Sequence, residues 1–289
     1  MVDVNAVNLA TNVLLLGALY SLVAIGFTLI FGVGGVLNLA HGAVLSIGAY
    51  SAVAVVRATG SVPLAAVAAA AGAGLFSLAF YKGMIRYARE SPVLVLILTL
   101  VMGLVIEQVV LVAFGGQALA VPSLLAGQTE VAGQRLSNNR VFVFALSWLL
   151  IGGLFYFVNR TKTGQAILAT SMSEKGAALV GIEADRVYTY TWILAGVLAG
   201  LAGLFLASFQ TATPLMGRTP LLLSFSIVVI GGLGSIRGSV IGAYLISFLD
   251  QVTVTLVSTR LAGVSALVVL VLVLLIKPEG LFGRELAEH

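Results

Sequence analysis

Long apolar runs separated by short polar segments dominate the chain. A helix needs roughly 20 residues to cross a hydrocarbon core of about 30 Å. Such runs occupy nine stretches, or eight crossings if the short, glycine-ended seventh run does not span: about 8–31, 36–56, 62–81, 92–114, 141–158, 187–209, 220–233, 239–256 and 261–276. The pattern predicts an all-α, polytopic transmembrane helical bundle.

Polar residues interrupt the second apolar run near its start. Asn38 and His41 lie among glycines, with Gly42 directly after the histidine. Irregular backbone survives in a membrane only where protein or water covers it. We therefore predict a helix break in which Asn38 and His41, three residues apart on one face, cap or bridge the freed carbonyl groups. Direct contact with a substrate and a proton relay are the alternatives, because polar groups inside a membrane are functional candidates.

Further candidates for the translocation path lie in two other runs. Glu107, with Gln108 beside it, lies inside the run 92–114. A charge at a helix centre costs about 2.5–3.5 kcal/mol on insertion scales, so Glu107 must be protonated, paired or facing a wet cavity. The stretch GGLGSIRGSVIGAY, beginning at 231, ends in the same IGAY as the first break and predicts a second break at Gly232 and Gly234. Asp250 lies nearer a helix end, where we expect water to reach it.

Small residues recur at helical spacing in the sixth run. Gly196, Gly200 and Gly203 lie in the sequence AGVLAGLAG. Faces of this kind let helix backbones approach closely in lipid. The spacing therefore favours tight helix packing, and a hinge or sliding face is the alternative interpretation.

Composition agrees with a membrane protein and excludes several kinds of chemistry. Hydrophobic residues make up 60% of the 289-residue chain and charged residues only 9%, against about 25% in soluble domains. The lack of cysteine excludes disulfides and thiolate metal sites, and two histidines are too few for a histidine metal site. No phosphate-binding loop or catalytic motif occurs, so we expect no metal, no cofactor and no enzymatic activity.

The net charge of +4 does not indicate nucleic-acid binding, because basic residues cluster in short loops, as the positive-inside rule expects. The clusters are Lys82, Arg86 and Arg89, then Arg160, Lys162, Lys175 and Arg186, and finally Lys277 and Arg284. Even numbers of crossings separate the clusters, so all three can lie in the cytoplasm. This predicts a cytoplasmic C-terminus and an outside N-terminus. The only charge in the N-terminal segment is Asp3. Isolated arginines oppose this orientation: Arg57, Arg135, Arg140, Arg218 and Arg260. The first run lacks the features of a signal peptide and is expected to be a retained helix.

The longest polar segment, about 159–186, predicts a short amphipathic helix with Leu168 and Met172 on its apolar face. A second helical piece ends at Gly181, a typical C-cap residue. One interpretation is an interfacial helix lying on lipid. The other is a docking helix for a cytoplasmic partner, which accounts better for the flanking glycines and the charged turn that follows.

Four blocks of this sequence resemble the permease subunits of branched-chain amino acid ATP-binding cassette (ABC) importers. GQAILATSMSEKGAALVGIEADRVYTYTWILAGVLAGLAG resembles their coupling region, and GALYSLVAIGFTLIFGVGGVLNLAHGAVLSIGAY their N-terminal signature. GGLGSIRGSVIGA and the terminal IKPEGLFG match two further blocks. The blocks occur in the family's order from end to end, and the chain is similar to the shorter of the two permease subunits.

The resemblance implies one permease domain over 1–289 with the ABC importer permease fold, located in the cytoplasmic membrane. It implies transport of branched-chain, hydrophobic amino acids with a second permease subunit as heterodimer partner, two cytoplasmic ATP-binding subunits and an extracytoplasmic substrate-binding protein. The coupling helix would lie in a groove on an ATPase subunit. The positions implied for this contact are Ser171, Glu174, Lys175, Ala178 and Gly181. Leu168 stands where the family often has arginine, which removes one charged contact.

Two alternatives to this function stay open on the sequence. The first is a permease of the same type for urea, amides or another small solute, since the binding protein selects much of the substrate. The second is a stand-alone, proton-coupled secondary transporter that uses Glu107 and His41.

Overall fold

The computed structural model describes residues 6–131, 134–277 and 280–282, and these residues form a helical bundle with one short hairpin. The charges expected at the chain ends, Asp3 and Arg284, lie outside the described residues. The helices are α1 (Ala6–Gly34), α2 (His41–Thr59), α3 (Val62–Phe80), α4 (Arg86–Ala88), α5 (Pro92–Phe114), α6 (Asn138–Arg160), α7 (Lys162–Met172), α8 (Glu174–Leu179), α9 (Ala184–Phe209), α10 (Arg218–Gly231), α11 (Ile236–Leu256) and α12 (Val264–Ile276). The strands β1 (Gln128–Val131) and β2 (Gln134–Ser137) pair antiparallel.

The all-α, polytopic prediction is confirmed. Seven helices within the described residues are long and apolar enough to cross a membrane. The other two predicted runs correspond to α10 and α12, which are apolar but shorter, so nine spans is an approximate count. The third run was predicted to end at Tyr81, but the helix continues through a π-helical turn, Tyr81–Ile85, to Ala88.

Local signals in the sequence explain where several helices begin. The Ser61 and Ser91 hydroxyls accept hydrogen bonds from the backbone N–H groups of Leu64 and Leu94, 3.4 Å away in each case. Each serine precedes a helix with proline in its first turn, where the missing N–H costs nothing. Serine N-caps with a following proline therefore set the starts of α3 and α5.

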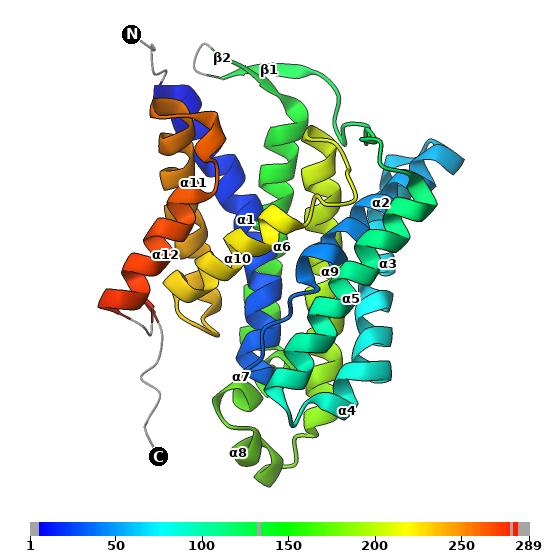
Figure 1. The fold of residues 1–289 in the computed structure, drawn as a ribbon, viewed down its shortest axis with the longest axis vertical. Coiled ribbons are helices and arrows are strands. Elements are labelled where there is room, and N and C mark those ends of the chain that lie inside the picture. Colours follow the sequence, from blue (N-terminus) through cyan, green and yellow to red (C-terminus); the bar gives the residue numbers. More distant parts are fainter. Residues whose placement is uncertain (1–5, 132–133, 278–279, 283–289) are drawn as a thin grey trace.

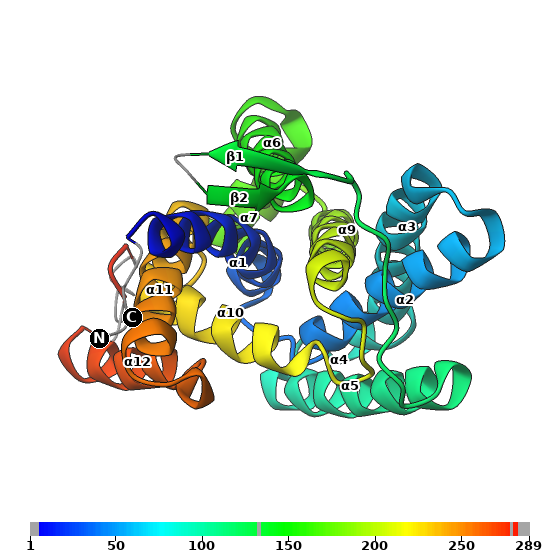
Figure 2. The ribbon, with the colours of Figure 1, turned by 90° about the horizontal axis from the view of Figure 1, so that it is seen from above.

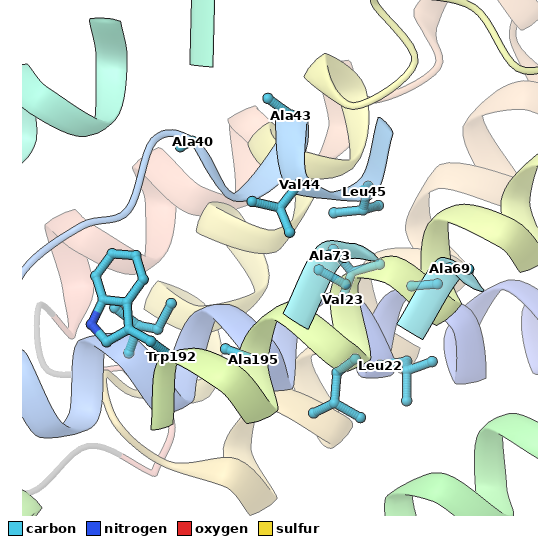
Figure 3. Packing of buried hydrophobic residues seen from close by; sticks show 14 of the residues in the cluster. Leu22, Val23, Ala40, Ala43, Val44, Leu45, Ala69, Ala73, Trp192 and Ala195 are labelled. Carbon is cyan, nitrogen blue, oxygen red and sulfur yellow. The ribbon is translucent and has the colours of Figure 1, made fainter. Parts of the chain in front are cut away.

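Two hydrophobic clusters hold the bundle together. The larger one joins α1, α2, α3, α5, α6 and α9, and Figure 3 shows part of it, with Leu45, Ala69, Ala73 and Ala195 meeting from three helices. The smaller cluster joins α1 to α10, α11 and α12 around Phe27 and Ile227. Figure 2 shows α1 and α9 in the interior with the other helices around them.

Glycines on α9 permit the closest helix contacts. A Cβ on Gly200 would overlap the Ala69 carbonyl oxygen of α3, and one on Gly203 would overlap the Leu45 carbonyl oxygen of α2. A Cβ on Gly196 would lie 2.7 Å from the Ala73 carbonyl oxygen. The predicted tight packing of this glycine stripe is confirmed, because each position touches a neighbouring backbone.

The bundle has two distinct ends. Figure 1 shows β1 and β2 at one end, named here the hairpin end, and α4, α7 and α8 at the opposite end, named the α8 end. At the α8 end, the Asp185 carboxylate lies 2.7 Å from Lys82 Nζ and 3.1 Å from Arg86 Nε. These ion pairs connect the end of α3 and its extension to the first turn of α9.

Candidate translocation path and coupling region

The break between α1 and α2 comprises residues 35–40. Gly35 has φ +62° and its N–H donates to the Phe31 carbonyl at 2.7 Å, which ends α1. The Asn38 side-chain oxygen accepts from the Ala40 N–H at 3.1 Å, and the Asn38 carbonyl accepts from the His41 N–H at 3.1 Å. Asn38 is buried, so it satisfies backbone donors inside the bundle at the start of α2.

His41 connects the start of α2 to the middle of α1. Its Nε2 lies 3.1 Å from the Val23 carbonyl oxygen, and its ring meets Phe27 edge-on at 5.8 Å between centroids. Since a carbonyl only accepts hydrogen bonds, Nε2 carries the proton in this arrangement. Asn38 and His41 therefore have separate partners: one orders the break and the other bridges two helices.

The N-termini of α2 and α10 meet inside the bundle. A Cβ on Gly42 would overlap the Gly217 carbonyl oxygen, and a Cβ on Gly217 would overlap that of Gly42. Figure 1 shows both helices beginning at mid-height rather than at an end of the bundle. Segment 210–217, which leads into α10, is anchored through paired hydrogen bonds of 2.8 and 2.9 Å between Ala212 and Leu119. The first turns of α2 and α10 thus touch each other away from both ends of the bundle.

Glu107 forms an ion pair at this internal position. Its carboxylate accepts two hydrogen bonds from Arg218, 3.0 Å from Nε and 2.7 Å from a terminal guanidinium nitrogen. Glu107 was predicted to be protonated, paired or facing a wet cavity, and the structure shows it paired with Arg218. Gln108 is exposed beside it on α5. Arg218 is 111 residues away in the chain and is an isolated arginine in its own segment, so no local signal identifies the pair.

The second predicted break lies between α10 and α11. Gly232 and Gly234 have φ values of +100° and +80°, which glycine adopts without strain. A Cβ on Gly32, near the end of α1, would lie 3.4 Å from the Gly234 Cα. The two glycine-rich breaks are therefore brought together, but at the α1 end of the first break rather than beside Asn38 and His41.

The C-terminal signature closes the end of α10. The N–H groups of Leu281 and Phe282 donate to the carbonyls of Ile230 and Gly231 at 2.8 and 3.1 Å. Helix C-termini leave carbonyls without partners inside the helix. Leu281 and Phe282, near the end of the run IKPEGLFG, therefore serve as a cap for a buried helix end.

Asp250 is buried, contrary to the prediction that water reaches it. The residue is 5% exposed. Its carboxylate accepts a hydrogen bond of 2.6 Å from the Gly263 N–H. Gly263 is the N-cap residue of α12, so Asp250 supplies the side-chain acceptor that this helix start lacks.

The predicted coupling region folds as α7 and α8 at the α8 end (Figure 1). The Ser173 hydroxyl caps α8 by accepting from the Gly176 N–H at 3.0 Å. Gly181 has φ +82°, its N–H donates to Ala178, and the Ile182 N–H donates to Ala177. This pair of bonds is the Schellman motif, so the predicted C-cap is confirmed.

Most of α8 projects from the bundle. Glu174, Lys175, Ala178 and Gly181 are exposed, while Ser171 is half-buried. The apolar face of α7 was wrongly predicted, since Met172 is 63% exposed and Ile167 is buried instead. Sequence reasoning also missed two apolar side chains at the tip, Leu179 at 89% and Val180 at 75% exposed. They lie at the end of a six-residue helix, which is too short for the spacing of apolar residues to show which side chains are exposed.

Tyr188 joins α8 to two long helices. Its hydroxyl lies 3.2 Å from a Glu174 carboxylate oxygen and 3.2 Å from the Val33 carbonyl oxygen. Glu174 is on α8, Tyr188 on α9 and Val33 near the end of α1. A displacement of α8 therefore acts directly on both interior helices.

His41→Ala is expected to lower the amount of folded protein in the membrane by severalfold. The change removes the bond to Val23 and leaves a buried cavity, and an unsatisfied buried group costs about 1–3 kcal/mol. His41→Gln keeps a donor and is expected to preserve more folded protein. Membrane abundance and uptake are measured on the same preparation. Full abundance of His41→Ala with abolished uptake would instead indicate contact with the substrate.

The chain is similar in sequence to known transport proteins. Residues 9–276 match the family model described as "Branched-chain amino acid transport system / permease component". The chain is 29% identical to the permease protein LivH of the high-affinity branched-chain amino acid transport system of Escherichia coli and 29% identical to BraD of Pseudomonas aeruginosa, over 94% of each chain in both cases. A probable LivH of Methanocaldococcus jannaschii is 28% identical over 91% of this chain and 88% of that protein. No solved structure matches.

Proposed function

Because the chain belongs to the permease component family of branched-chain amino acid transport systems, we propose that it carries branched-chain, hydrophobic amino acids across the cytoplasmic membrane as the permease of an ABC importer. The family match over residues 9–276 is the observation that carries this proposal. It covers nearly the whole chain, which supports one permease domain over 1–289. Helices of spanning length and the break at Asn38, which is buried in the bundle, support a translocation role.

The proposed partners are a second, different permease subunit, two cytoplasmic ATP-binding subunits and an extracytoplasmic substrate-binding protein. The chain carries no phosphate-binding loop, so ATP hydrolysis is assigned to the partners. The exposed apolar tip of α8, Leu179 and Val180, supports a protein partner there, because apolar side chains in water favour burial. The proposed ATPase contact comprises Ser171, Glu174, Lys175, Ala178 and Gly181.

The proposed mechanism couples ATP-driven closure of the ATPases to rocking of the helices. Movement of α8 reaches α9 and α1 through the Tyr188 hydroxyl and its two neighbours, Glu174 and Val33. Access to the path then alternates between the two membrane faces. The two breaks, at residues 35–40 and at Gly232 and Gly234, are proposed to border the path, because irregular backbone inside a membrane lines protein or water.

The proposed orientation places the α8 end in the cytoplasm and the N-terminus outside. Lysines and arginines gather at that end, including Lys82, Arg86 and Lys175. Arg218 does not oppose this orientation, because it is the first residue of α10, which begins at mid-height in the bundle (Figure 1). The positive-inside rule counts basic residues in short loops, and a paired arginine inside the bundle is not one of these.

Purification of the tagged chain from its native membrane is expected to bring the ATP-binding subunits and a second permease with it. Proteoliposomes of this complex, with the binding protein outside, are expected to take up leucine only when ATP is supplied on the opposite side. In the chain without its ATP-binding partners, a unique cysteine at Lys175 should react from the cytoplasmic side alone. Preferential uptake of urea or amides would contradict the substrate, and ATP-free uptake by this chain alone would favour a secondary transporter.

A further inference from the structure

The Glu107–Arg218 ion pair lies away from the ends of the bundle. Glu107 is seven residues before the end of α5 at Phe114, which places it about 10 Å from that helix end. The other ion pairs among the described residues join Asp185 to Lys82 and Arg86, or Glu183 to Arg186, at the α8 end. A charge pair inside a spanning segment is expensive to keep, so its presence calls for a role.

Helix stability does not explain Arg218. It is the first residue of α10, whose first turn has no acidic residue. A helix N-terminus carries partial positive charge and favours anions, so an arginine there has the unfavourable sign. The guanidinium and the helix N-terminus together form a positive site, which the Glu107 carboxylate occupies in this structure.

The pair is buried on one side and open on the other. The Glu107 side chain is 11% exposed, whereas that of Arg218 is 58% exposed. Arg218 uses two of its N–H groups on Glu107, and a guanidinium has five. Because an arginine facing lipid is costly, the open side must face water or a partner protein. Donors therefore remain available for a second acceptor.

An apolar cavity lies near the start of α10. A cavity of about 140 Å³ lies between α10 and α12, and its lining includes Thr219, Leu222 and Leu267. Thr219 follows Arg218 directly. Leu222 lies three residues after Thr219, on the same face of α10 as Thr219. Figures 1 and 2 both show α10 between α5 and α12 on one face of the bundle. The ion pair thus joins α10 to α5, whereas the cavity lies on the α12 side of α10.

We propose that the Glu107–Arg218 pair is the site that recognises the charged backbone of the transported amino acid. The proposal rests on the proposed function. Arg218 and the α10 N-terminus take the substrate carboxylate, and Glu107 takes its ammonium group. A zwitterion exchanges one ion pair for two and leaves no charge unpaired.

The same chemistry excludes other solutes. An amine or a carboxylic acid of the same shape would leave one protein charge without a partner in a poorly solvated site, which is costly. Urea carries no charge and cannot compete with the ion pair. The site therefore selects α-amino acids over neutral solutes after the binding protein has released them.

The first test measures leucine uptake by the complete complex carrying the double change E107Q and R218Q. Two amides still hydrogen-bond and leave no unpaired charge, so assembly of the complex is expected to persist. Uptake is expected to fall at least tenfold. Wild-type uptake by the assembled double variant would overturn the proposal, because a purely structural pair tolerates this replacement. Absence of amino acid uptake by the wild-type complex would overturn the proposed function and this inference together.

The second test needs no change to the pair. The chain has no cysteine, so T219C carries a unique thiol beside the site, and T129C on β1 serves as the control. In the complete complex, leucine is expected to slow alkylation of T219C severalfold, while isoamylamine, 4-methylpentanoate and urea do not. Equal protection by these analogues, or the same effect of leucine on T129C, would overturn recognition of the zwitterion.

Discussion

Gly203→Ala is expected to remove nearly all folded protein from the membrane, although it adds a single methyl group. Glycine to alanine inside a helix normally stabilises it by roughly 1 kcal/mol. At this position the new Cβ would overlap the Leu45 carbonyl oxygen of α2 and lie 2.8 Å from its carbonyl carbon. Backbone atoms cannot rotate away as a side chain can, so α2 and α9 must separate.

Overpacking of this kind costs about 1–3 kcal/mol, and more where nothing can yield. A loss of about 3 kcal/mol corresponds to roughly a hundredfold change in the folding equilibrium. The measurement is the amount of monodisperse protein recovered after detergent extraction, using a fluorescent fusion. Gly153→Ala on α6 is the matched control, because a Cβ there meets no atom within 4 Å. Equal recovery of the two variants would show that α2 and α9 do not touch at Gly203.

Ala178→Trp is expected to abolish ATP-dependent uptake while leaving the chain folded. Ala178 lies on the exposed surface of α8, so the larger side chain displaces nothing inside the permease. If α8 lies in a closely fitting groove on an ATPase, the indole leaves no room for docking. This single substitution therefore tests coupling to the ATPase without changing the fold of the permease.

Three quantities decide the outcome of this experiment: recovery of the chain, ATP hydrolysis by the complex and leucine uptake. Recovery should match the wild type, uptake should fall by more than tenfold, and hydrolysis should no longer respond to loaded binding protein. Ala58→Trp is the control, since Ala58 is also an exposed alanine, at the far end of α2. Normal uptake by an assembled Ala178→Trp complex would remove α8 from the coupling role.

Gly181 shows how much local sequence decides. A glycine after a short helical piece predicts a C-cap, and the chain forms a Schellman motif there with φ +82°. The break before His41 was likewise visible, because polar residues among glycines cannot continue an apolar helix at no cost. Caps, breaks and spanning lengths depend on residues a few positions apart, so the sequence by itself determined them.

Glu107 and Asp250 show what the sequence could not decide. Their partners, Arg218 and Gly263, are 111 and 13 residues away, and nothing in either local pattern names them. The exposed apolar tip at Leu179 and Val180 was also hidden, because exposure depends on which helices surround a segment. Apolar length and local backbone chemistry thus determined the helices and their breaks. Only tertiary packing, which brings distant residues into contact, decided which charges pair and which surfaces stay open.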